Sequence, residues 1–62
     1  MNKQQIQLLE LASNGLNNQE IGNIMEVSER TIKNKFYKLF KAMKAKNRTH
    51  AVAIALRENI IK

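Results

Sequence analysis

The sequence predicts an all-α fold, a four-helix bundle that contains a helix-turn-helix. The 62-residue chain has no proline, and its β-branched residues do not alternate with polar ones, so strands are not expected. Side chains suited to capping a helix recur along the chain, each followed by apolar residues at helical spacing. Because no linker, repeat or low-complexity segment interrupts this pattern, we expect one domain over residues 1–62.

The first helix is expected to end at about Ser13. Asn2 and Gln5 have the spacing of a capping box, in which each side chain accepts a hydrogen bond from the backbone of the other. The apolar face that follows consists of Ile6, Leu8, Leu9, Leu11 and Ala12. Gly15 lies where a helix end requires a positive φ, and Leu16 can fold back onto the helix.

Two further helices are expected, separated by a short turn. Asn17 and Glu20 repeat the capping box and predict a short helix from about Asn18 to Met25. Ser28 caps the next helix, which is the longest. With residues about 100° apart, this helix has an apolar face on one side and a basic face on the other. The apolar face consists of Ile32, Phe36, Leu39, Phe40 and Met43. The basic face consists of Arg30, Lys33, Asn34, Tyr37, Lys41 and Lys44, with Lys35 and Lys38 beyond it.

Asn47 is expected to cap a fourth helix that runs to about Glu58, with Asn59 as a left-handed residue after it. One side of this helix would close the bundle with Ala51, Ile54 and Ala55. The residues nearer the opposite side are Thr49, Val52, Ala53 and Leu56. A small bundle rarely exposes such an apolar stripe without using it for an interaction. The alternative is a lightly exposed apolar edge on a monomer.

The formal net charge of +6 is unevenly distributed. Nine basic side chains and no acidic one lie from Arg30 to Arg57, and four of the five glutamates precede Arg30. A basic half of this kind favours a polyanion as partner, nucleic acid first and an anionic membrane second. No stretch is long and apolar enough to span a membrane, and no signal peptide is apparent. We therefore expect a cytoplasmic, nucleoid-associated protein without a membrane partner.

The same composition argues against an enzyme or a metal site. The chain has no cysteine, no aspartate and a single histidine, His50, for which a capping or solvated role is expected. No acid and base converge in the sequence, and no cofactor or small-molecule ligand is expected.

A short capped helix, a tight turn and a longer helix with a basic outer face describe a helix-turn-helix over approximately residues 17–43. In this motif the first helix supports the second, which enters the major groove of DNA. The segments "GLNNQEIGNIMEVSERTIKNK" and "NRTHAVAIAL" resemble the DNA-binding domain of the LuxR/FixJ (NarL/GerE) family of bacterial transcription regulators. The resemblance covers nearly the whole chain. It departs from the family pattern at Gly22, usually alanine, at Lys35, usually histidine, and at Lys44, usually glycine.

The resemblance implies that the third helix reads DNA and that the fourth, approximately residues 48–58, forms a homodimer through Thr49, Val52, Ala53 and Leu56. It places Lys33, Asn34 and Tyr37 at base edges, and the helical periodicity places the same residues on the outer face. Lysine can donate to guanine and asparagine can pair with adenine. The residues expected at phosphates are Asn18, Arg30, Thr31, Lys35 and Lys38.

The leading hypothesis is therefore sequence-specific binding of double-stranded DNA by a transcription regulator that is dimeric on paired half-sites. A second hypothesis is a helix-turn-helix that binds and inhibits another regulator. A third is a surface-active basic peptide, because the third helix is amphipathic and cationic. The caps and the other apolar helix faces argue against the third, since they predict a bundle that hides the apolar side.

Overall fold

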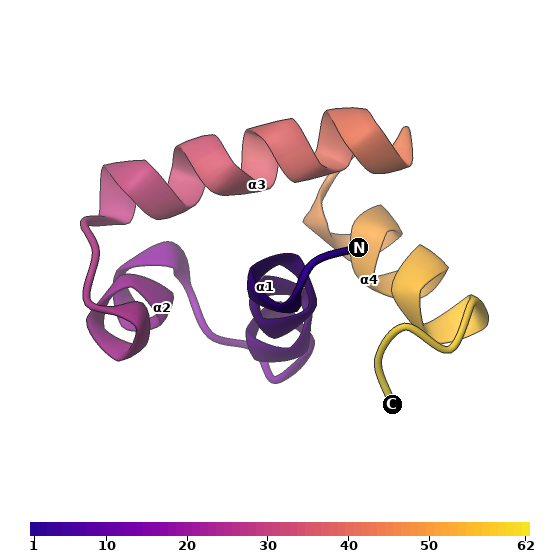
Figure 1. Ribbon diagram of the computed structural model, residues 1–62, viewed down its shortest axis with the longest axis horizontal. Helices are drawn as coiled ribbons and strands as arrows, with labels where there is room; N and C mark the ends of the chain where they lie inside the picture. The colour runs from indigo at the N-terminus through magenta and orange to yellow at the C-terminus, as the bar shows by residue number, and fades with distance from the viewer.

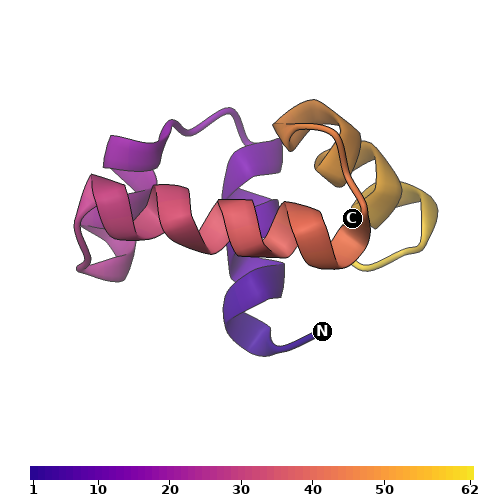
Figure 2. The same ribbon diagram turned by 90° about the horizontal axis from the view of Figure 1, so that it is seen from above.

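The computed structural model describes all of residues 1–62 and contains four helices and no strand. The helices are α1 (Lys3–Ser13), α2 (Asn18–Met25), α3 (Glu29–Met43) and α4 (Arg48–Arg57). Figure 1 shows α3 lying across the molecule, with α2 near its first turns, α1 end on beneath its middle and α4 near its last turns. The view from above in Figure 2 shows that α1 crosses beneath α3. The predicted all-α bundle with a helix-turn-helix is confirmed.

Local side-chain contacts set the four helix starts. The N-cap residues are those expected from the sequence, Asn2, Asn17, Ser28 and Asn47. In α2, Glu20 N donates to Asn17 Oδ1 and Asn17 N donates to Glu20 Oε1, each at 2.8 Å. α1 begins with a capping box of the same kind. Since these contacts join residues three positions apart, the helix starts follow from short stretches of sequence.

The helix ends depend on left-handed residues. Gly15 follows α1 with φ of +85°, and Asn59 follows α4 with φ of 58°, as expected. Lys44 ends α3 with φ of 58°, although it replaces the glycine that is usual at this position. Ala45 N donates to Phe40 O at 2.8 Å and closes the end of the helix. A left-handed conformation at a residue other than glycine costs about 1 kcal/mol or more, so Lys44 is strained.

The core is formed by residues from all four helices and from the chain that follows α4. Its buried members are Leu8, Leu9, Ile21, Ile32, Phe36, Leu39, Ala51, Ala55 and Ile61. The apolar face predicted for α3 points into this core, with Phe40 and Met43 half-buried at its edge. Ile61 was not anticipated from the sequence; it is buried because the chain folds back after α4.

The turn between α2 and α3 fixes how the two helices of the motif sit together. Glu26 is left-handed, with φ of 61°, and Val27 N donates to Gly22 O at 3.0 Å. A Cβ atom at Gly22 would lie 2.6 Å from Val27 O, closer than a side chain tolerates. Gly22 therefore permits the close approach of the turn, a role beyond its low helix propensity.

Candidate nucleic-acid interface

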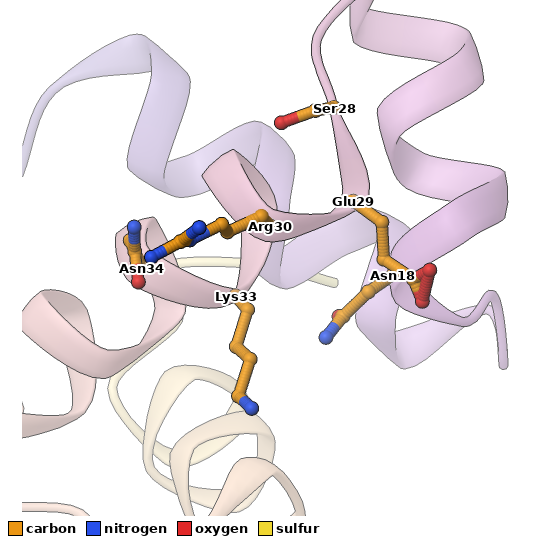
Figure 3. A pocket seen from close by; sticks show the side chains of 6 residues that line it. All are labelled: Asn18, Ser28, Glu29, Arg30, Lys33 and Asn34. Carbon is orange, nitrogen blue, oxygen red and sulfur yellow. The ribbon is translucent and has the colours of Figure 1, made fainter.

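A polar cleft with a volume of about 780 Å³ opens between the first turns of α2 and α3. Figure 3 shows the side chains that line it, Asn18, Ser28, Glu29, Arg30, Lys33 and Asn34. Asn18 comes from the start of α2 and the other five from the start of α3 and its cap. Four of the residues predicted to contact DNA thus meet in one place: two expected at phosphates and two expected at base edges.

The cleft is electrostatically suited to an anion. The first N–H groups of a helix have no intrahelical partner, and the helix dipole makes this end positive. Two such ends, those of α2 and α3, border the cleft together with the cations of Arg30 and Lys33. Glu29 is its one acidic side chain; it favours the start of α3 but opposes a bound phosphate. The balance of charge in the cleft is positive.

The three residues predicted to read bases are all exposed on α3. Lys33 and Asn34 point in different directions from the helix in Figure 3, as expected for consecutive helical residues about 100° apart. Tyr37 is 63% exposed, and Lys41 Nζ lies 5.2 Å from the centre of its ring, within the range of a cation–π contact. A second cavity of about 230 Å³ is lined by Asn18, Lys33, Phe36, Tyr37, Phe40 and Arg48.

The residues predicted to contact phosphates do not all lie at the cleft. Lys35 is half-buried, and its Nζ donates to Gln4 Oε1 of α1 at 2.9 Å. Lys35 and Lys38 line a third cavity, of about 150 Å³, beside the start of α1. Thr31 is half-buried with its Oγ1 2.9 Å from Ser28 Oγ. The structure thus places Lys35 and Lys38 beside α1, apart from the cleft residues.

Arg48 makes contacts that were not predicted from the sequence. From the first turn of α4, its Nη1 donates to Leu16 O at 3.1 Å and its Nη2 donates to Asn18 Oδ1. Its Cζ lies 4.3 Å from the centre of the Phe36 ring. Burial lowers the pKa of the guanidinium, which nevertheless remains protonated. One signal was present: a cation in the first turn of a helix opposes the helix dipole, which indicates a partner elsewhere.

The outer side of α4 carries most of the stripe predicted for dimerisation. Thr49, Ala53 and Leu56 are exposed, Leu56 by 47%. Val52 is half-buried and packs against the core, so it lies at the edge of this stripe. His50 has the capping role expected for it, because its Nδ1 accepts a hydrogen bond from Lys46 N at 2.9 Å.

The structure lacks a membrane-spanning helix and a cluster of metal ligands. None of the four helices combines the length and apolarity that a membrane crossing requires. The structure contains no cluster of three or more histidine, cysteine or acidic side chains that could hold a metal ion.

Comparison with known proteins agrees with the helix-turn-helix. A family model described as bacterial regulatory proteins, luxR family, matches residues 1–55. The chain is 32% identical over 59 residues to the "Uncharacterized transcriptional regulatory protein YxjL" of Bacillus subtilis (strain 168). This match covers 95% of the chain but 27% of the relative, so the chain spans about a quarter of that protein's length. No solved structure gives a significant match. Since the family model covers most of its length, the chain belongs to the luxR family of bacterial regulatory proteins.

Proposed function

We propose that this chain binds double-stranded DNA sequence-specifically, with α3 in the major groove, and serves transcription regulation. The observation that carries the proposal is the cleft, where the starts of α2 and α3 gather Asn18, Arg30, Lys33 and Asn34. The major groove of B-DNA, about 12 Å wide, admits one α-helix. Family membership supports the same function, because the family consists of bacterial regulatory proteins.

Within this function, the exposed face of α3 reads bases. Lys33 donates to the O6 and N7 acceptors of guanine, and Asn34 pairs with the N6 and N7 atoms of adenine. Tyr37 offers a ring edge to a thymine methyl group or a hydroxyl to a phosphate. These side chains are exposed, and none of them makes a side-chain hydrogen bond within the protein, so DNA would not have to displace one.

Phosphates on the two strands that border the groove would be held by the two flanks of α3. On the side of the cleft, a phosphate would be bound by Arg30, by Asn18 and by the N–H groups of the helix starts. On the side next to α1, a phosphate would be bound by Lys35 and Lys38. Lys35 would then exchange its hydrogen bond to Gln4 for one to the phosphate. Thr31 would contribute its hydroxyl at the start of the helix.

Two copies would pair through the outer stripe of α4, formed by Thr49, Val52, Ala53 and Leu56. Thr49, Ala53 and Leu56 are exposed, and the small side chains of Thr49 and Ala53 would let two helices approach closely. Two-fold pairing would set the two α3 helices on half-sites about one helical turn of DNA apart. Leu56→Asp should therefore keep the helical circular-dichroism signal and abolish cooperative binding to a palindromic site.

Gln7→Glu is the matched control for that variant, because it adds the same charge at an exposed position of α1. It should bind cooperatively, like the unmodified chain. If Leu56→Asp also fills both half-sites cooperatively, α4 is not the dimer surface.

Selection of duplexes from a random pool tests the proposed function itself. We expect the chain to enrich a related set of sequences and to bind them at least about tenfold more tightly than scrambled duplexes of equal length. Binding that does not distinguish selected from scrambled duplexes would refute sequence-specific recognition. The result would then favour the alternative of a domain that binds another protein.

A further inference from the structure

We propose that Arg48 is a positioning residue for DNA binding, which holds the Asn18 side chain so that its amide nitrogen faces the phosphate backbone. The inference rests on the proposed function. It concerns a residue that lies outside the helix-turn-helix, 30 residues from Asn18 in the sequence, and whose side chain reaches from the first turn of α4 to the start of α2.

The orientation of Asn18 follows from the chemistry of its partner. A guanidinium group carries only hydrogen-bond donors, so the atom of Asn18 that meets Arg48 Nη2 must be the carbonyl oxygen, Oδ1. With Oδ1 held, Nδ2 is fixed on the other side of the amide, and it makes no hydrogen bond within the protein. In Figure 3 the nitrogen is at the outer end of Asn18, on the side towards which Lys33 extends. A donor placed there suits a phosphate oxygen, which only accepts.

Arg48 can fix this orientation because it is itself fixed at two other points. Its Nη1 donates to the carbonyl of Leu16 at 3.1 Å, in the connection between α1 and α2. Its guanidinium lies over the ring of Phe36, with 4.3 Å between Cζ and the ring centre. The planar fork of an arginine can satisfy two acceptors and stack on a ring at once, which a lysine cannot. Arg48 thus ties α4, α3 and the start of α2 together behind the cleft.

A double-mutant cycle with Arg48→Met and Asn18→Ala tests the inference on a duplex selected for the unmodified chain. Methionine keeps an unbranched side chain but removes the donors. Each single variant should weaken binding about five- to tenfold, because each removes or misorients one charge-assisted contact. If Arg48 acts through Asn18, the double variant should bind about as weakly as the weaker single variant. Independent effects would multiply instead.

Control variants distinguish the loss of the Asn18 orientation from the loss of the Arg48 charge and from a loss of folding. Lys46→Met removes the same charge two residues earlier and should weaken binding less than Arg48→Met. Arg48→Lys keeps the charge and loses the fork, so it should also weaken binding. If Arg48→Met does not fold, Arg48→Lys takes its place in the double-mutant cycle with Asn18→Ala. Urea denaturation identifies conditions in which each measured variant is folded, and binding is compared only there.

The outcomes distinguish this inference from the proposed function. No affinity of the unmodified chain for any duplex would overturn both. Affinity of the unmodified chain, together with multiplicative losses in the double variant, would overturn only the role of Arg48. So would Arg48→Lys binding as tightly as the unmodified chain. The role of Arg48 would be supported if the losses of affinity in the two single variants do not multiply in the double variant and if Arg48→Lys also binds DNA more weakly.

Discussion

The two ends of α3 carry similar positive charge but have different surroundings. At the N-terminal end, Arg30 and Lys33 border a polar cleft, and a tight turn holds the helix against α2. At the C-terminal end, Met43 instead lines a mostly apolar groove of about 290 Å³ shared with α4 and the chain ends, and the strained Lys44 ends the helix. Positive charge is thus common to both ends of α3, whereas polar groups of a second helix converge with it only at the N-terminal end.

The largest expected effect separates the two ends directly. Lys33→Ala should weaken binding to a selected duplex by about 1–3 kcal/mol and relax the preference at one base position. Lys41→Ala removes the same charge about two turns farther along α3 and should weaken binding less. Fluorescence anisotropy with matched duplexes measures both variants. Equal losses for the two would show that charge, and not position in the cleft, controls recognition.

The next effect concerns the turn that holds the N-terminal end of α3 against α2. Gly22→Ala should reduce the free energy of unfolding by up to about 2 kcal/mol, because crowding costs about 1–3 kcal/mol and the gain in helix propensity returns about 1 kcal/mol. The crowding comes from the Val27 carbonyl oxygen, 2.6 Å from the new Cβ. Asn23→Ala, on the exposed side of α2, gains propensity without the contact and is the control. Urea denaturation that found Gly22→Ala as stable as the unmodified chain would contradict this role for the turn.

A smaller effect is expected on the side of α3 next to α1. Lys38→Ala should weaken binding to selected and random duplexes about equally and lower the salt dependence by about one unit of slope. The reason is that Lys38 lies outside the cleft, beside the start of α1, and is proposed to contact a phosphate rather than a base. Binding measured on both kinds of duplex at several salt concentrations provides the check. A loss confined to the selected duplex would instead make Lys38 a base-reading residue.

The smallest effect belongs to the C-terminal end. Lys44→Gly should stabilise the fold by about 1 kcal/mol or less, because glycine adopts the left-handed conformation without strain but loses more chain entropy on folding. DNA affinity should change little. Lys46→Gly, at a position without a positive φ, should not stabilise. Thermal unfolding followed by circular dichroism would show the difference, and equal shifts for the two variants would argue against strain at Lys44.

What could be predicted from the sequence follows from how far apart the interacting residues lie. The four N-caps, the helix bounds and the inner face of α3 were predicted, since each depends on residues three or four positions apart. The exposed positions of Lys33, Asn34 and Tyr37 follow from the same periodicity. Convergence of Asn18 with the start of α3 followed from recognising the motif.

The features that were missed depend on contacts across the fold. Arg48 meets Asn18 and Leu16 from 30 and 32 residues away, and Lys35 meets Gln4 across 31 residues. No local pattern encodes such pairs, because packing of the helices decides them. The close contact of the turn with Gly22 and the partial burial of Val52 also arise only when the helices are packed.

A salt titration of binding to duplex DNA tests the central claim most directly. The logarithm of the association constant should fall linearly with the logarithm of salt concentration, with a slope of about −0.9 for each phosphate that a cationic side chain neutralises. Three cationic side chains proposed at phosphates, Arg30, Lys35 and Lys38, predict a slope of about −2.7 for each bound subunit. Weak binding that is indifferent to salt between about 50 and 200 mM would contradict DNA binding by this surface.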